Sequence, residues 1–416
     1  FGVTTHPASP WVVQQLREAF PDNTTPRFLI YDNDSIFSDR VTESSKNIGI
    51  EPQRTAYQSR WQNGIAGVSD PIKMSQRAVH ASYPELRGKE NLSALWRHGN
   101  RNQENRTMQQ AAEDPYGLNR DWTGNTPVSY PDPAWEVLDS KFTGTQGNST
   151  LQRIWHGSGH DAALWTEGPV WMGDWGCLLW SDIPNHRTLR WNEEDGHVSV
   201  FQRESDYANG HTRDNQGRLV ACEHDSRRVT RREYDGTWTV LADKFDGKPL
   251  NSPNDAAVHA DGAVWFTDPG YGILWPYEGH VATAEQPNRV YRVDAETGQI
   301  SAVAEGPMHR PNGICFSPDF SKLYVVDSGA TDGPEYAANI IQYDMDGDGR
   351  NASGPRVFAD FSPGFTDGIR CDTDGNLWCS WGWGGVQTNG VRVHAPDGTL
   401  LAFLHTPEVI ANLCFG

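Results

Sequence analysis

One oxygen-bearing residue recurs six times along this chain, each time at the head of a short apolar run. The six register residues are Glu167 (EGPVW), Asn209 (NGHTRD), Asn254 (NDAAV), Asn312 (NGICF), Asp367 (DGIRC) and Asn412 (NLCFG). They are separated by 42, 45, 58, 55 and 45 residues. A spacing in this range predicts a repeat architecture in which each repeat is one structural unit. If the repeats are arranged radially, the six side chains converge on one axis and can form a metal site from oxygen ligands.

Short strand-like runs separated by turns fill the sequence between the register residues. Runs such as VWFTD and LYVVD follow the turn sequences HADGA and SPDFS, and further runs such as RVYRVD and IIQYD follow longer loops. Short strands at this density favour an all-β propeller or sandwich, and a propeller blade has four strands. Six register residues therefore predict a six-bladed β-propeller over residues 131–416.

The sixth blade is expected to be incomplete. Only its inner run, VIANLCFG, precedes the last residue, Gly416. The stretch LQRIWHG (Leu151 to Gly157) is expected to supply the outermost strand of this blade, because such a closure removes exposed sheet edges. The two middle strands have no candidate sequence, which predicts an open sixth blade and a C-terminally truncated domain.

The charge of the chain is uneven, and this narrows the class of partner. The net charge is −19, with 15 Lys and Arg against 17 Asp and Glu in residues 1–150 and 20 against 37 in residues 151–416. An acidic repeat region argues against nucleic acid as its partner. With no run of about 18 apolar residues, no membrane span is predicted.

The six cysteines lie mostly in apolar runs without a CxxC pair, so we expect them to be reduced core residues. A cytoplasmic location is expected, with the periplasm left open, and the oligomeric state is not predicted.

Several longer segments resemble one known family. Residues 131–416 resemble the gluconolactonase branch of the SMP-30/gluconolactonase/luciferin-regenerating-enzyme family. The segments that carry the resemblance are PDPAWEVLD (from Pro131), EGPVW (from Glu167), LLWSDIPNHRTLRW (from Leu178), YANGHTRDNQGRLVACEH (from Tyr207), LNSPNDAAV (from Leu250), WFTDPGYGI (from Trp265) and RPNGICFSPD (from Arg310). The resemblance implies a six-bladed lactonase that opens a gluconolactone-type sugar lactone to the aldonic acid, with one divalent metal in the central channel.

Carried over position by position, the resemblance implies roles for four register residues. Glu167, Asn312 and Asp367 match the direct metal ligands, and Asn254 matches a fourth polar residue that touches metal, water or substrate. The acid/base role falls on Asp367, which would act on the attacking water. Oxygen-only ligands suit Ca²⁺ or Mg²⁺ better than typical zinc ligand sets do. Ca²⁺ is therefore expected, with Mg²⁺, Zn²⁺ and Mn²⁺ left open.

Further residues are candidates for substrate binding. Asn209 and Asn412 share the register, and each either forms hydrogen bonds in the channel or has a structural role. His224 follows a strand-like run and either reaches the channel mouth or is a buried structural histidine. Asp268 and Tyr271 lie in FTDPGYG, where a loop could cover the site and touch substrate.

The front of the chain resembles a different family. Residues 1–66 resemble part of the catalytic core of retroviral-type integrases and insertion-sequence transposases, in FGVTTHPASPWVVQQLREAF, RFLIYDNDSIF and RTAYQSRWQNGIAG. Such cores use three carboxylates, of which only Asp32 has a match, as the second; the third should follow WQNGIA, where this chain has Gly67. We therefore expect residues 1–67 to be a small, non-functional α/β fragment with a helix over Trp11 to Phe20 and a strand over Arg27 to Asp34. Residues 68–130 are polar and are expected to be a weakly ordered linker.

Other functions are open alongside a metal-dependent lactonase. An organophosphate or other ester hydrolase could use the same site, and a propeller could bind metal with its catalysis impaired. A nucleic-acid-acting enzyme would need the carboxylates that the front end lacks. A serine hydrolase has no support, because no GxSxG motif occurs.

Overall fold

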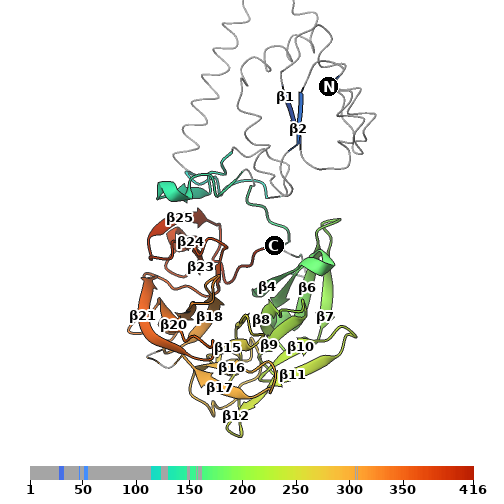
Figure 1. Ribbon diagram of the computed structural model, residues 1–416, viewed down its shortest axis with the longest axis vertical. Helices are drawn as coiled ribbons and strands as arrows, with labels where there is room; N and C mark the ends of the chain where they lie inside the picture. Colours follow the sequence, from blue (N-terminus) through green and yellow to red (C-terminus); the bar gives the residue numbers. More distant parts are fainter. Residues whose placement is uncertain are drawn as a thin grey trace, which may run out of the picture. The chain divides into compact units, whose positions relative to one another are not determined.

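The computed structural model describes residues 28–31, 46, 51–54, 114–122, 130–147, 150–155, 157, 162–304, 306 and 308–416 (Figure 1). The chain forms two compact units, one of Phe1–Glu113 with Gly147–Ser149 and one of Asp114–Gln146 with Thr150–Gly416. Within the described part of the chain, no helix is long and apolar enough to cross a membrane.

The first unit contains one described pair of strands. β1 (Phe28–Tyr31) and β2 (Glu51–Arg54) are parallel neighbours. β1 falls inside the strand expected over Arg27 to Asp34. Asp32 and the helix expected over Trp11 to Phe20 lie outside the described residues, so the integrase-like fragment stays a prediction.

The second unit is an all-β propeller in which antiparallel sheets surround a common axis (Figure 1). The first four sheets have four strands each, and within each sheet every strand pairs with the next one along the chain. Their strands are β4 (Thr166–Met172), β5 (Cys177–Asp182), β6 (Arg187–Asn192) and β7 (Val198–Arg203); β8 (Ala208–Arg213), β9 (Leu219–Glu223), β10 (Arg228–Arg232) and β11 (Trp238–Ala242); β14 (Ala256–Val258), β15 (Val264–Asp268), β16 (Arg289–Val293) and β17 (Ile300–Val303); and β18 (Pro311–Phe316), β19 (Lys322–Asp327), β20 (Asn339–Met345) and β21 (Ala352–Asp360). A two-stranded ribbon, β12 (Lys244–Phe245) with β13 (Lys248–Pro249), joins the second sheet to the third.

The fifth sheet differs, because a strand from an earlier part of the chain joins it. Its strands are β22 (Ile369–Cys371), β23 (Leu377–Trp381), β24 (Gly390–His394), β25 (Leu400–His405) and then β3 (Trp135–Val137). β3 pairs with β25, and Trp135 packs edge-on against Trp378 with ring centroids 5.8 Å apart. The Trp135 side chain of β3 therefore packs against the apolar core beside this sheet.

The described residues form five blades, so the expected sixth blade is not confirmed. Residues 151–155 form no strand, which corrects the expectation that Leu151 to Gly157 would be an outermost strand. The backbone N–H of Leu151 instead donates to Asp132 Oδ2 at 2.8 Å. After β25 the chain runs without regular strand to Gly416, and the Ala411 carbonyl in this segment accepts a hydrogen bond from Gly368 N (2.7 Å).

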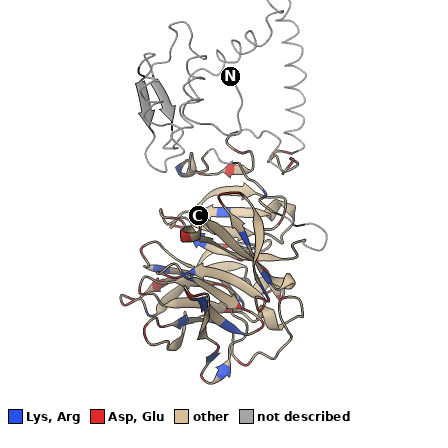
Figure 2. Cartoon of the chain, turned by 90° about the vertical axis from the view of Figure 1, so that its right-hand side faces the viewer, with Lys and Arg blue, Asp and Glu red and all other residues tan. Residues whose placement is uncertain are grey.

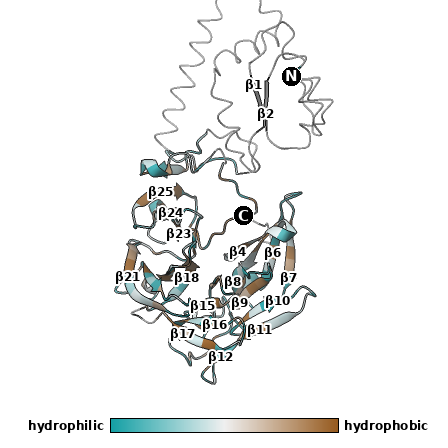
Figure 3. Ribbon diagram, viewed as in Figure 1, coloured by the Kyte–Doolittle hydropathy of each residue, from teal (hydrophilic) through white to brown (hydrophobic). Residues whose placement is uncertain are grey.

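The blades are held together by apolar side chains between neighbouring sheets. β9 and β15 are buried along their whole length, as expected for second strands covered on both faces. Hydrophobic and hydrophilic residues alternate over the strands of the blades (Figure 3). Trp265 of the third blade and Tyr343 of the fourth are both fully buried in one shared cluster. Because side chains at a sheet-to-sheet contact interdigitate, each blade needs its neighbour to bury its own face.

Residues 114–122, which fall in the range expected to be a linker, pack onto the propeller unit. Arg120 forms a two-pronged ion pair with the buried Asp132, both bonds at 2.8 Å, and Tyr116 stacks on His405. All six cysteines are free thiols, as predicted. Lys and Arg and Asp and Glu are scattered over the strands and loops of this unit (Figure 2).

Candidate metal and active site

The register residues lie on the innermost strands or directly beside them. Glu167, Asn209 and Asn312 belong to β4, β8 and β18. Asn254 and Asp367 precede β14 and β22 by two residues each. The first five are contributed by five different blades, and Asn412 lies in the irregular segment after β25.

A glycine follows four of the register residues, and at each of them it allows a close approach between neighbouring segments. A Cβ atom on Gly168, Gly210 or Gly313 would lie less than 3.0 Å from the backbone oxygen of the next register residue. A Cβ on Gly368 would meet Asn412 at a similarly forbidden distance. The missing side chain therefore allows neighbouring innermost strands to approach closely at the axis.

Hydrogen bonds connect these register positions into a ring. Gly210 N donates to the Asn254 carbonyl at 2.8 Å, Gly313 N donates to the Asp367 carbonyl at 3.1 Å, and Thr267 Oγ1 donates to the Asn312 carbonyl at 2.7 Å. Asn412 Nδ2 then donates to Glu167 Oε2 at 3.1 Å, which joins the sixth register residue to the first. Asn412 thus lies beside the first register residue, although the described residues contain no sixth sheet.

Two acidic side chains meet inside this ring. Glu167 is only 4% exposed. Burial raises its pKa to about 7, and the negative charges of Asp255 and Glu278 add to the effect of burial. Burial raises the pKa of Asp367 well above its usual range, and the negative charge of Glu167 raises it further. The Asp367 side chain is also hydrogen-bonded to Glu167. Two carboxyl groups in contact, one buried and one half-buried, favour sharing a proton or binding a cation.

The amide register residues are oriented by neighbouring groups. Asn312 Nδ2 donates to Ser328 Oγ at 3.0 Å, which directs Oδ1 away from that contact. Asn209 Nδ2 lies 3.2 Å from His224 Nε2, while His224 Nδ1 lies 3.2 Å from the Glu278 carbonyl oxygen. Because a carbonyl can only accept, His224 carries its proton on Nδ1 and accepts from Asn209. Burial lowers the pKa of His224 to about 4, so the ring is neutral near pH 7.

The donor set fits a divalent cation that prefers oxygen. Glu167 and Asp367 supply carboxylate oxygens whose mutual repulsion a cation would relieve, and Asn254 and Asn312 supply amide oxygens from adjacent positions of the ring. Among the described residues there is no group of three or more His, Cys, Asp or Glu side chains placed to hold a metal. A metal here would therefore depend on the two amides, as is common for Ca²⁺ and uncommon for zinc.

Asp268, a predicted substrate-binding residue, contacts the backbone before Asn254. It is fully buried, and its two carboxylate oxygens accept from the backbone N–H groups of Asn251 (2.8 Å) and Ser252 (2.6 Å). Asp327 holds His309 N and Arg310 N in the same manner, both at 2.8 Å. In both blades the clamped backbone lies two and three residues before the register residue. This parallel favours a structural role for Asp268.

Tyr271 reaches toward the ring from the following loop. Its hydroxyl lies 2.9 Å from Ser328 Oγ and 3.0 Å from Thr331 Oγ1. Burial raises its pKa, and the negative charge of Asp367 contributes to the rise. Tyr271 is therefore near the carboxyl pair, while its hydroxyl is engaged with protein groups.

Two charged features of the site have no counterpart in the six-fold register. Glu278 lies in the loop after Tyr271, with one carboxylate oxygen 3.6 Å from His224 Nδ1, and burial raises its pKa to about 7. Asp255 forms an ion pair at 3.0 Å with Arg370, which joins the third blade to the fifth. The sequence signal for the ion pair is weak, because the two residues are 115 positions apart.

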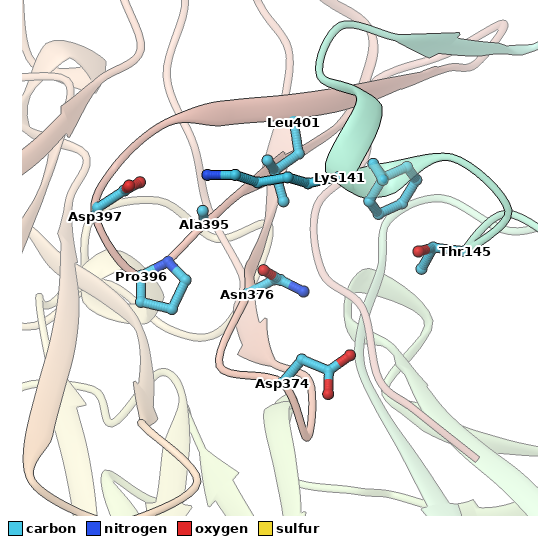
Figure 4. Close-up of a pocket in the computed structure, with 9 residues that line it drawn as sticks. Lys141, Thr145, Asp374, Asn376, Ala395, Pro396, Asp397 and Leu401 are labelled. Atoms are coloured by element: carbon cyan, nitrogen blue, oxygen red, sulfur yellow. The ribbon is translucent and has the colours of Figure 1, made fainter.

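A surface pocket lies elsewhere in the unit (Figure 4). It has a volume of about 380 Å³ and is lined by the turn Ser140–Phe142, the loop after β22 and the turn between β24 and β25. Lys141, Asp374 and Asp397 are among its lining residues, and none of the register residues lines it.

Comparison with known proteins agrees with this architecture. A family model described as "SMP-30/Gluconolactonase/LRE-like region" matches residues 165–416. A gluconolactonase of Zymomonas mobilis is 30% identical over 275 residues, which cover 61% of this chain and 73% of the relative. The pentonolactonase XacC of Haloferax volcanii is 28% identical over 254 residues, covering 60% and 77%.

A solved structure supports the same assignment. The gluconolactonase XC5397 of Xanthomonas campestris is 36% identical, superposes with a TM-score of 0.56, and the match covers 63% of this chain and 81% of that one. The predicted family is thereby confirmed over residues 165–416, together with the predicted enzyme class, a lactonase-type hydrolase. The chain belongs to the SMP-30/gluconolactonase/LRE-like family.

Proposed function

We propose that this protein hydrolyses a sugar lactone of the gluconolactone type to its aldonic acid, using one divalent cation held by Glu167, Asn254, Asn312 and Asp367. The observation that carries the proposal is the contact between the buried Glu167 carboxyl and the half-buried Asp367 carboxyl inside a ring of amide groups. Family membership and the lactonases among its relatives support the choice of substrate.

In the proposed lactone hydrolysis, the cation and the side chains have different roles. A divalent cation supplies Lewis-acid polarisation of the lactone carbonyl and a lowered pKa for water. Asp367 takes the proton of the attacking water and returns it to the ring oxygen as the acyl carbon–oxygen bond breaks. Glu167 holds negative charge at the site and is itself held by the Asn412 amide. The product is an open-chain hydroxy acid.

The donor chemistry supports Ca²⁺ as the ion, because every proposed ligand is an oxygen. We also propose that the register is that of a six-bladed propeller, with the segment around Asn412 at the sixth position. The six free thiols support a reducing compartment such as the cytoplasm. The acidic repeat region supports a small-molecule substrate rather than nucleic acid.

Lactone hydrolysis in a pH-stat tests the proposal. Glucono-δ-lactone should be hydrolysed above the uncatalysed rate, EDTA should abolish that rate, and added Ca²⁺ should restore it. Asp367→Asn should lower kcat by about 100-fold or more, because it removes the proton acceptor. Lactone turnover that survives both EDTA and this substitution would refute the proposal.

Paraoxon run beside the lactone separates the alternatives. Metal-dependent paraoxon turnover that exceeds lactone turnover would favour an ester or phosphotriester hydrolase. Metal binding without turnover of either compound would favour a propeller that binds metal without catalysis.

A further inference from the structure

A serine outside the register contacts one of the proposed metal ligands. Ser328 follows β19 directly and is fully buried. Its Oγ lies 3.0 Å from Asn312 Nδ2, 2.9 Å from the Tyr271 hydroxyl and 3.3 Å from the Arg310 carbonyl oxygen. Three groups therefore compete for the one proton and two lone pairs of this hydroxyl.

The orientation of the Asn312 amide follows from which of these groups can donate a proton. The Arg310 carbonyl can only accept, so Ser328 donates its single proton there. The lone pairs of Oγ remain for Tyr271 and Asn312, and both of those groups must donate. Asn312 consequently presents its NH₂ to Ser328 and turns its Oδ1 in the other direction.

Orientation matters here because an amide has one oxygen that can bind a cation and one nitrogen that cannot. Reversing the amide would place an NH₂ group against the cation. Glu167 and Asp367 do not need this control to the same degree, since both oxygens of a carboxylate are acceptors. The orientation of the Asn312 amide therefore depends on Ser328, which accepts from Asn312 because its own proton goes to the Arg310 carbonyl.

We propose that Ser328 is a positioning residue for the metal site, which, with Tyr271 satisfying its second lone pair, holds the Asn312 amide with Oδ1 toward the cation. The inference rests on the proposed function only in that it requires a cation at the register ring. It assigns Tyr271 to the support of a ligand, through the hydrogen bond that its hydroxyl donates to Ser328 Oγ.

Metal affinity of the full chain tests the role, measured by calorimetric titration with Ca²⁺. Ser328→Ala should raise Kd by about 10- to 100-fold, the usual effect of removing a group that orients a ligand. Ser328→Thr keeps the hydroxyl and should restore most of the affinity. Thr331→Ala is the matched control, because Thr331 contacts Tyr271 and the Ser328 backbone while no contact joins it to Asn312; its Kd should stay within about threefold of the wild type.

A double-mutant cycle separates positioning from general support of the fold. In an Asn312→Asp background the ligand is a symmetric carboxylate, so Ser328→Ala should no longer weaken Ca²⁺ binding. An equal loss of affinity in both backgrounds, or no loss in either, would overturn the inference. If the wild type binds no divalent cation at all, it is the proposed function that fails, and thermal unfolding of the metal-free variants shows whether Ser328→Ala is folded.

Discussion

At the scale of single residues, the contact between the Glu167 and Asp367 carboxyl groups determines the chemistry of the candidate site. Glu167 and Asp367 come from different blades, Glu167 is buried and Asp367 half-buried, and their carboxyl groups are hydrogen-bonded to each other. Burial and like charge both favour the protonated form of a carboxyl group. A cation at the ring would favour the ionised form, so protons and metal should compete for these two side chains.

Metal affinity should therefore fall as the pH falls. The pKa of Glu167 in the metal-free protein is about 7, so the ionised, metal-binding form is lost below that pH. Between about pH 8 and pH 6 the Ca²⁺ Kd should rise, approaching about tenfold per pH unit for each proton displaced. Calorimetric titrations in buffers of different ionisation enthalpy measure both the Kd and the proton release. A Kd that is independent of pH, with no protons released, would show that the pair is not the binding site.

Asp268 offers a second test at the same scale. Asp268→Asn should lower the free energy of unfolding by about 1–3 kcal/mol, because one of two buried backbone donors loses its acceptor. Asp327→Asn is the matched comparison, since Asp327 makes the same pair of contacts in the next blade. Urea unfolding measures the loss in both variants. A fully stable Asp268→Asn variant with a raised KM for lactone would restore the substrate contact that the sequence suggested.

At the scale of single elements, the innermost strands are held together by missing side chains. The glycine after a register residue brings two neighbouring strands within backbone hydrogen-bonding distance, as in the bond from Gly313 N to the Asp367 carbonyl. The apolar run that follows then enters the core between blades. In this repeated dipeptide the polar residue contributes to the candidate site, and the glycine allows the close packing of neighbouring strands.

Gly313→Ala should damage both functions of this dipeptide. The new Cβ would overlap the Asp367 backbone, which cannot move freely because it is part of the ring. The expected cost is about 1–3 kcal/mol of unfolding free energy, or somewhat more, together with weaker Ca²⁺ binding. Gly347→Ala is the control, since nothing lies within 4 Å of its added Cβ. Equal stability of the two variants would rule out close approach as the reason for the glycine.

Across the whole molecule, one buried ion pair connects parts of the ring that are distant in sequence. Asp255 follows a register residue of the third blade, and Arg370 belongs to the first strand of the fifth. The Asp255 side chain is 1% exposed and that of Arg370 16%. The pair holds the blades on either side of the fourth in a fixed relation, and it neutralises a carboxylate close to the proposed metal ligands.

Asp255→Asn should destabilise the propeller far more than the loss of a surface pair would. It leaves a largely buried guanidinium without its counter-charge, at a cost of about 3–5 kcal/mol. Asp344→Asn is the comparison, because Asp344 pairs with Arg356 where both side chains are almost half exposed. That variant should lose at most about 1 kcal/mol. Denaturant unfolding measures the free energy of unfolding of both variants. Similar losses would mean that the buried pair stabilises the propeller no more than a surface pair does.

The sequence by itself determined the all-β class, the order of the strands and the register of polar residues at the axis. These features follow from local periodicity, since alternating apolar runs and turn residues specify strands wherever they occur. The family resemblance over residues 131–416 added a proposed ligand set, which stays a prediction. It could not show how the ligands are oriented.

Only the tertiary structure decided which distant groups meet. β3 joins the fifth sheet by pairing with β25, because the Trp135 side chain finds its apolar partners there. Glu278 and Ser328 join the site from loops whose sequences carry no periodic signal, and Arg370 meets Asp255 across the fourth blade. Such contacts depend on the closure of the ring, and ring closure is a property of all blades together rather than of any one repeat.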